Sequence, residues 1–117
     1  MSRSRLILAA AFLVVAALVL ADVGAARPAA ATVTVTAKEF KFVLSSKSVP
    51  KGTVTFAVVN KGKLAHDFKI NGKKSPMIPP GKKATLKVTF AKAGSYPYLC
   101  TVPGHAKFGM KGVLKVT

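Results

Sequence analysis

Four side chains in this sequence could act together on one metal ion. Cys100, His105 and Met110 follow one another as C-x4-H-x4-M, and His66 lies well before them in the chain. A thiolate and a thioether are soft donors that favour Cu(I), whereas imidazole suits both oxidation states of copper. A trigonal Cys–His–His set with a weak axial Met is typical of copper sites that transfer single electrons. Zinc is the rival metal for Cys and His, but it gains little from a thioether.

Each candidate ligand also has an ordinary structural interpretation. A single inward His is commonly a hydrogen-bonded core residue, a single buried Cys behaves as a small hydrophobic residue, and a Met at a strand start usually packs. The combination of the four residues, rather than any one of them, therefore predicts the copper site. Met77 has no neighbouring His or Cys, and we interpret it as a packing or surface residue.

Alternation along the chain predicts that three of the four candidates, His66, Cys100 and Met110, face the interior. Successive side chains of a strand point to opposite faces, so residues of equal parity share a face. The parity sets that contain the candidates are Leu64, His66, Phe68 and Ile70; Tyr96, Tyr98 and Cys100; and Met110, Leu114 and Val116. We therefore expect Cys100 to close one strand, Met110 to open the next, and the loop between them to carry His105.

The elements that must position these residues are short strands. From Thr32 onward the hydrophobic period is two, and turn signals separate the runs. No helical pattern follows Ala31, so the chain is predicted to be all-β, either a sandwich or a barrel. Asn71-Gly72 is a candidate hairpin turn, and Pro97 implies an edge position or a bulge in its strand.

The N-terminal residues are typical of a secretory signal. Arg3 and Arg5 precede an apolar run, and small residues follow that would suit cleavage after Ala26 or Ala31. We therefore expect a signal peptide over residues 1–31 and one domain over 32–117, exported to the periplasm or the extracellular face of the cytoplasmic membrane. An uncleaved segment that tethers the domain to the membrane is the alternative.

Composition excludes several classes of function. The 117 residues include 19 Lys+Arg, three Asp+Glu, two His and one Cys. One Cys rules out an internal disulfide, and two His cannot ligate the several copper centres of an oxidase. With so few acids, paired-carboxylate catalysis is disfavoured, and we expect no enzyme.

The positive charge of the predicted domain comes from lysine alone, which does not favour a nucleic acid as the partner. Residues 32–117 carry sixteen lysines, no arginine and only two acids, Glu39 and Asp67. Base recognition depends heavily on Arg, and an exported chain rarely meets nucleic acid, so we predict none as a partner. The lysines either maintain solubility or attract acidic proteins or an anionic membrane surface.

Over about Thr32 to Thr117 the chain resembles the cupredoxins, the small plastocyanin-like blue copper proteins. The matching stretches are Val49-Pro50-Lys51-Gly52, Asn60-Lys61-Gly62, His66-Asp67-Phe68, Pro79-Pro80-Gly81, Gly94 to His105, and Met110-Lys111-Gly112. The resemblance implies a Greek-key β-sandwich with one type 1 copper ion at one end. It also implies equatorial ligands at His66, Cys100 and His105 and an axial ligand at Met110.

One position departs from the pattern of the family. Many members carry Asn after the first ligand His, whereas this chain carries Asp67. We predict that Asp67 accepts a hydrogen bond from the hydroxyl or N–H of Thr101 and so ties the two ligand segments together. Its negative charge near the metal should favour Cu(II).

The resemblance implies a carrier that shuttles single electrons between redox proteins. Electrons would cross the exposed edge of His105, inside a docking patch of small and apolar residues: Pro103, Gly104, Ala106, Phe108 and Gly109. Lysines such as Lys107 and Lys111 would rim this patch and steer partners with acidic surfaces. The alternatives are a copper carrier or storage protein, and a metal-free basic domain that binds polyanions.

Overall fold

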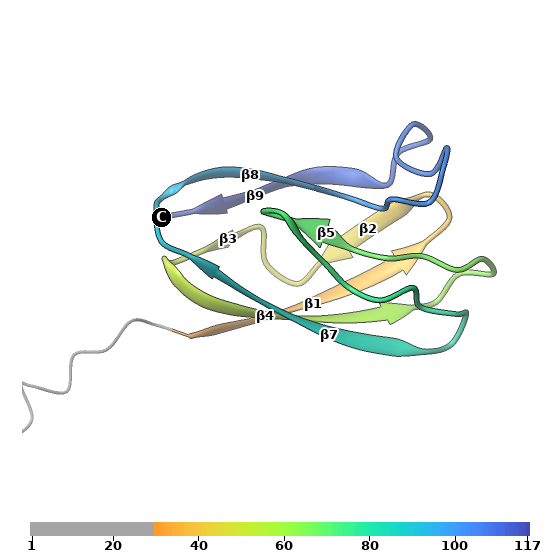
Figure 1. Cartoon of the computed structure of the whole chain (residues 1–117), viewed down its shortest axis with the longest axis horizontal. Helices are drawn as coiled ribbons and strands as arrows, with labels where there is room; N and C mark the ends of the chain where they lie inside the picture. The colour runs from red at the N-terminus through yellow and green to blue at the C-terminus, as the bar shows by residue number, and fades with distance from the viewer. Residues whose placement is uncertain (1–29) are drawn as a thin grey trace, which may run out of the picture.

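A computed structural model describes residues 30–117 as two packed layers of β-strands (Figure 1). Within this range the chain forms strands and turns and no helix. The strands are β1 (Ala31–Lys38), β2 (Lys41–Leu44), β3 (Ser48–Val49), β4 (Gly52–Asn60), β5 (Lys69–Ile70), β6 (Lys73–Lys74), β7 (Lys83–Phe90), β8 (Gly94–Leu99) and β9 (Lys111–Val116). The all-β prediction is confirmed.

The two layers are mixed sheets. The first has the order β2-β1-β4-β7, in which β1 runs parallel to β4, and the second has the order β3-β9-β8-β5-β6, in which β3 runs parallel to β9. The chain crosses between the sheets after β2, β3, β4, β6 and β7, so strands adjacent in sequence often lie in opposite layers. The result is the predicted Greek-key β-sandwich.

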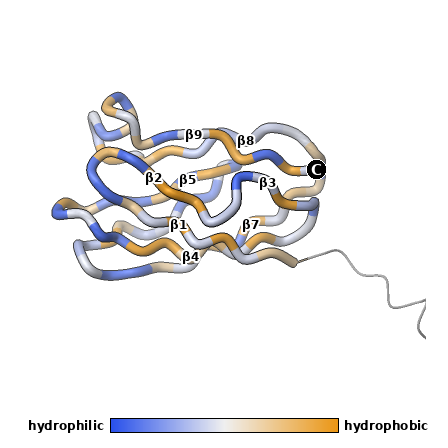
Figure 2. The backbone as a smooth tube through the Cα atoms, turned by 180° about the vertical axis from the view of Figure 1, so that it is seen from behind, coloured by the Kyte–Doolittle hydropathy of each residue, from blue (hydrophilic) through white to orange (hydrophobic). Residues whose placement is uncertain are grey.

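The core lies between the two sheets and is rich in aromatic rings. Phe68 is fully buried, and its ring centroid lies 5.1 Å from that of Phe56 on β4, 5.2 Å from that of Phe42 on β2 and 5.3 Å from that of Tyr98 on β8. Hydrophobic segments run along strands of both layers (Figure 2). Burial of such rings is the main stabilising contribution in a domain of this size.

Two local predictions are confirmed by the backbone. Asn71 and Gly72 have φ angles of 51° and 75°, the conformation of a type I′ turn, and they join β5 to β6. Pro97 pairs with Val113 of β9 on one side, while on the other side the pairing with β5 stops at Tyr98. Pro97 therefore lies at a locally open edge of β8, where its missing N–H leaves no hydrogen bond unmade.

The parity prediction for the segment before β5 is wrong at Leu64. This side chain is 47% exposed, although His66, Phe68 and Ile70 are buried as expected. The N–H groups of Lys63 and Leu64 are bound by a side-chain carboxylate instead of a neighbouring strand. The chain therefore bends here, and strand alternation does not begin until it has passed this point.

The predicted signal segment falls outside residues 30–117 except for its last two residues. Strand β1 already begins at Ala31, the second of the two expected cleavage positions, and Ala31 pairs with Val54 of β4. In the range that the structure describes, no helix has the length and apolar character needed to cross a bilayer.

Candidate metal centre

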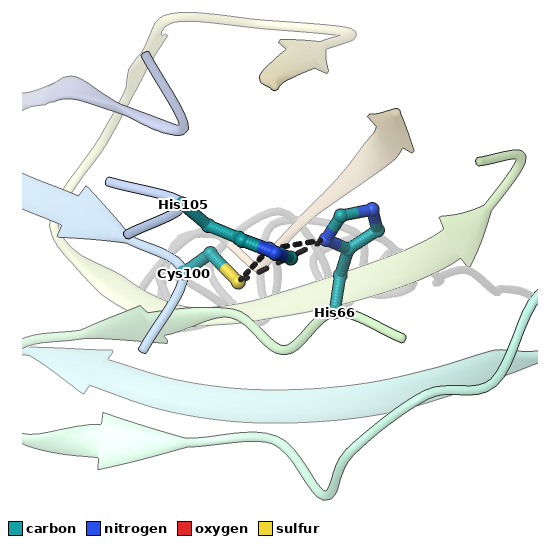
Figure 3. A group of neighbouring side chains, drawn as sticks. All are labelled: His66, Cys100 and His105. Atoms are coloured by element: carbon teal, nitrogen blue, oxygen red, sulfur yellow. Dashed lines mark hydrogen bonds between the residues drawn. The ribbon is translucent and has the colours of Figure 1, made fainter. Parts of the chain in front are cut away.

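Three of the four predicted side chains converge at one end of the sandwich, and their donor atoms face one another (Figure 3). The Sγ of Cys100 lies 3.9 Å from Nδ1 of His66 and 3.7 Å from Nδ1 of His105. The two Nδ1 atoms are 3.1 Å apart. All three residues are buried, with exposed fractions of 1% for Cys100, 0% for His66 and 8% for His105.

The spacing of these donors fits one ion. Nitrogen and sulfur ligands bind a first-row metal such as zinc at about 2.0 to 2.3 Å, so donors that share an ion lie less than about 4.6 Å apart. The separations of 3.1, 3.7 and 3.9 Å meet this limit. One thiol and two imidazoles are also the donor types that copper accepts in a trigonal site.

The loop between β8 and β9 is closed by its own backbone. Cys100 N–H donates to the carbonyl of Met110 (3.0 Å), and Met110 N–H donates to the carbonyl of His105 (3.1 Å). Met110 is fully buried in a small cluster with Cys100 and Ala37. The compact C-x4-H-x4-M loop thus brings Met110 next to Cys100.

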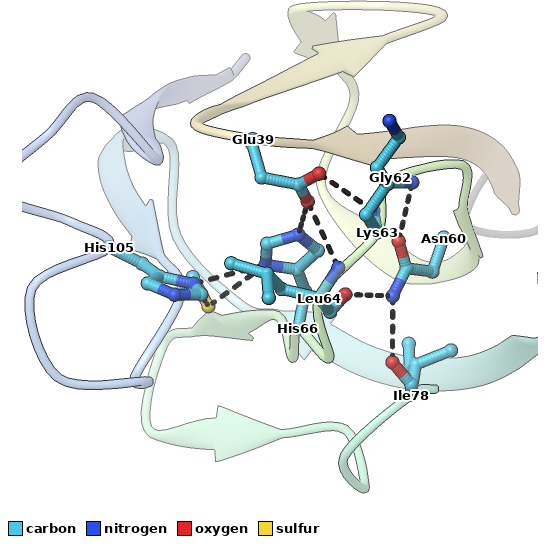
Figure 4. A network of polar contacts seen from close by, with 9 residues as sticks. Glu39, Asn60, Gly62, Lys63, Leu64, His66, Ile78 and His105 are labelled. Atoms are coloured by element: carbon cyan, nitrogen blue, oxygen red, sulfur yellow. Dashed lines mark hydrogen bonds and ion pairs between the residues drawn. The ribbon is translucent and has the colours of Figure 1, made fainter. Parts of the chain in front are cut away.

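His66 comes from a separate segment that is held by Asn60, the last residue of β4. The backbone of His66 exchanges two hydrogen bonds with that of Ile78, of 3.1 and 2.8 Å. The buried Asn60 side chain donates to the carbonyls of Leu64 and Ile78 and accepts from the N–H of Gly62, each at 2.8 Å (Figure 4). One amide therefore fixes the loop that delivers His66.

Burial shifts the pKa of two candidate ligands, Cys100 and His105. It raises the pKa of the Cys100 thiol, so the thiol must lose a proton when it binds a metal. Burial, followed by repulsion from His66, lowers the pKa of His105. His105 is therefore kept neutral, which is the form of imidazole that coordinates metals.

The predicted link between Asp67 and Thr101 is confirmed. The buried carboxylate of Asp67 accepts from the N–H of Thr101 at 2.6 Å and from its hydroxyl at 2.5 Å. This contact joins the residue after His66 to the residue after Cys100. It fixes the distance between the two ligand segments independently of any metal.

Glu39 is a residue of the site that the sequence analysis did not find. Its carboxylate lies 2.5 Å from Nε2 of His66, on the side of the ring away from Cys100. Hydrogen bonds from the backbone of Lys63, followed by that from the His66 ring, lower the pKa of Glu39. One signal was available in the sequence: Glu39 and Asp67 are the only acids after residue 31, and both lie at this site.

The surroundings of His105 differ in part from the expectation of an exposed edge. Only 8% of His105 is exposed, and the ring of Phe40 contacts it edge-on at a centroid distance of 5.1 Å. The ring of Phe108, which is 67% exposed, also contacts Phe40, at a centroid distance of 5.2 Å. The apolar surface near His105 is therefore supplied largely by aromatic rings.

Comparisons with known proteins agree with the β-sandwich fold. The sequence profile of the cupredoxin-like domain matches residues 9–116. Auracyanin B has 25% sequence identity and a TM-score of 0.67, over 79% of this chain and 91% of its own. Auracyanin A, described as a "blue" copper protein from the green thermophilic photosynthetic bacterium Chloroflexus aurantiacus, has 22% identity and a TM-score of 0.66, over 76% of this chain and 100% of its own, and shows the shared fold.

A copper protein of Pseudomonas aeruginosa matches a shorter stretch. The copper-resistant cuproprotein CopI is 45% identical over 42 residues, which are 36% of this chain and 23% of CopI. The chain thus matches less than a quarter of the length of this relative. The profile, the fold and the grouped Cys and His donors support one type 1 copper ion as the cofactor, and the chain belongs to the cupredoxin family.

Proposed function

We propose that this chain is an exported, non-catalytic carrier of single electrons that holds one copper ion on His66, Cys100, His105 and Met110. The observation that carries the proposal is the convergence of one thiol sulfur and two imidazole nitrogens within 3.9 Å of one another. When bound there, copper supplies a one-electron Cu(I)/Cu(II) couple. We further propose that residues 1–31 are the secretory signal and that the domain works outside the cytoplasmic membrane.

The rigidity of the site supports electron transfer over transient metal binding. Asn60 fixes the loop of His66, and Asp67 ties that loop to Thr101 beside Cys100. Because these contacts do not involve the metal, the donors stay in place when the charge of the ion changes. A site that moves little on oxidation and reduction exchanges electrons with a low barrier.

A docking face for redox partners lies at the same end of the molecule. The exposed residues Pro103, Gly104 and Phe108 of the predicted docking patch lie on the loop that carries His105, and exposed Leu64 extends this patch from the loop that carries His66. Every lysine in residues 30–117 is exposed, and Lys63 and Lys107 belong to the two loops that carry this patch. We propose that His105 passes the electron to partners that dock here through acidic surfaces.

The function is tested by electron exchange with an acidic redox protein. The copper-loaded domain should show intense visible absorption, and stopped-flow mixing should show single-electron transfer that slows at least about tenfold as salt screens the lysines. A neutral small-molecule oxidant is the control, because its rate should not depend on salt. A copper complex without intense colour, or one that exchanges electrons only over minutes, would contradict the proposal.

A second candidate function is copper delivery or storage. It is favoured by the 42-residue match to CopI, whose name links it to copper resistance. A delivery protein should release copper rapidly to a competing chelator, whereas an electron carrier should retain copper through many redox cycles. Measuring copper release beside the electron-exchange rate on the same sample separates the two functions.

Substitutions of Met110 should change the reduction potential in opposite directions. Met110→Leu replaces the axial donor with an apolar side chain, which disfavours the higher charge of Cu(II), so the potential should rise. Met110→Gln supplies an oxygen donor, so the potential should fall. We expect shifts on the order of 59 mV, equal to a tenfold change in the relative affinity for the two oxidation states. Voltammetry that finds the same potential in both variants would remove Met110 from the ligand set.

A further inference from the structure

The outer nitrogen of His66 is bound by a carboxylate. Nε2 of His66 lies 2.5 Å from Oε2 of Glu39, whose side chain is 25% exposed, whereas the His66 side chain is fully buried (Figure 4). The same carboxylate accepts from the N–H of Lys63 at 2.6 Å and from that of Leu64 at 3.4 Å. Glu39 precedes β2, so the contact joins the β1–β2 turn to the loop that carries His66.

This contact decides which nitrogen of His66 faces the site. A neutral imidazole has one N–H and one lone pair, and the carboxylate can only accept at Nε2. Nδ1 therefore carries the lone pair, and this is the atom directed toward Cys100 and His105. A carboxylate on the far N–H of a ligand His also orients the ring and makes it a stronger donor.

The need to anchor the loop that carries His66 does not by itself explain why the charged residue Glu39 lies here. Asn60 already holds the same loop through Gly62, Leu64 and Ile78, using neutral groups only. Residues 32–117 otherwise contain a single acid, Asp67, which also lies beside the site, against sixteen exposed lysines. Both negative charges of a strongly basic domain are therefore placed next to the candidate ligands.

We propose that Glu39 is a positioning residue of the metal centre, which fixes the tautomer of His66 and favours Cu(II) by placing a negative charge against the ligand ring. The proposal rests on the assignment of His66 as a ligand. Glu39 is then the second carboxylate that acts on the site. The first, Asp67, binds the backbone beside Cys100 rather than a ligand ring.

The charge and the hydrogen bond of Glu39 can be separated by two substitutions. Glu39→Gln keeps an oxygen that accepts from Nε2 of His66, but it removes the charge and the second oxygen that accepts from the N–H of Lys63. Because Asn60 still holds this loop, the fold and the visible absorption should remain. The relative affinity for Cu(II) over Cu(I) should fall about tenfold, which raises the potential by about 59 mV. Glu39→Ala removes both features and should weaken Cu(II) binding by about 10- to 100-fold.

Gly62 offers a variant that keeps Glu39 but moves its carboxylate. A Cβ added to Gly62 would meet Oε2 of Glu39 and lie only 2.8 Å from its Cδ and 3.0 Å from its Oε1. Gly62 is not among the residues with positive φ, so its backbone accepts alanine. Gly62→Ala should therefore push the carboxylate off His66 and shift the potential in the same direction as Glu39→Gln.

Lys38→Gln is the matched control. The substitution changes one unit of charge at Lys38, the exposed residue next to Glu39. Lys38 makes no contact with His66 among the hydrogen bonds and ion pairs of residues 30–117. Removing a positive charge should lower the potential, and only slightly, because solvent screens it. A shift in the opposite direction to that of Glu39→Gln, and smaller, is the expected result.

Nitrogen NMR of the metal-free protein keeps this test separate from the proposed function. The wild-type His66 should show Nε2–H and an unprotonated Nδ1, and Glu39→Ala should give a mixture of both tautomers. A wild-type ring with its proton on Nδ1 would overturn the proposal whether or not copper binds. Reduction potentials that stay unchanged in Glu39→Gln and Gly62→Ala would also overturn the proposal for Glu39. If the wild type still shows intense absorption in that case, the proposed function as an electron carrier is not affected.

Discussion

Replacing Cys100 with serine is expected to abolish the intense visible absorption of the copper-loaded protein. The absorption arises from charge transfer between thiolate sulfur and Cu(II), and a serine oxygen is a hard donor with no comparable transition. Cys100 is only 1% exposed, and serine is nearly the same size, so the shape of the site should change little. We expect copper affinity to fall by at least about 100-fold, because serine stays protonated at neutral pH.

Absorption titrations with Cu(II), combined with thermal unfolding of the metal-free forms, measure this result. Ala37→Ser is a matched control, because Ala37 is fully buried in the same cluster as Cys100 and Met110 and receives the same hydroxyl. Its stability should fall by about 1 to 3 kcal/mol, as for any unsatisfied buried hydroxyl, while the absorption persists. A Cys100→Ser protein that keeps the band would exclude the thiolate from the copper site.

Copper binding is expected to stabilise the folded domain by about 4 kcal/mol when free copper is 1,000 times its dissociation constant. The candidate ligands come from two segments, one around His66 and one from Cys100 to Met110, so only the folded chain presents all of them to one ion. The unfolded chain binds copper weakly through separate side chains. The free energy of unfolding should therefore follow the copper concentration.

Urea unfolding with and without Cu(I), kept reduced to protect the thiol, tests this linkage. A strong Cu(I) chelator should return the midpoint to that of the metal-free protein. Cys100→Ser should lose most of the increase, whereas Ala37→Ser should keep it. Equal midpoints for the wild type with and without copper would show that the donors do not share an ion.

The loop that supplies most of the candidate site could be predicted because its geometry is local. Cys100, His105 and Met110 lie within eleven residues, and a turn between two adjacent antiparallel strands must return the chain to its start. Alternation then assigns Cys100 and Met110 to the interior, as found. The contact of Asp67 with Thr101 was also predictable, because the family resemblance aligned the two segments.

The errors and omissions arise where the chain leaves regular structure. Leu64 is exposed because the loop of His66 bends around a carboxylate, and strand parity carries no information inside such a bend. Glu39 is separated from His66 by 27 residues, and nothing in either local sequence indicates their contact. Asn60 is recognisable in the sequence only as part of a stretch that resembles the family, although its side chain holds three backbone groups.

The residue pattern was enough to predict the class of fold and the chemistry of the candidate site. Period-two hydrophobicity predicts strands with one buried face, and one Cys, two His and Met110 together predict a soft-metal centre. Contacts between distant segments place Nδ1 of His66 toward the thiol and Glu39 against the other nitrogen of the ring. Those contacts join residues far apart in the chain, and side-chain orientation across two packed sheets depends on the packing of both layers, which no local pattern encodes.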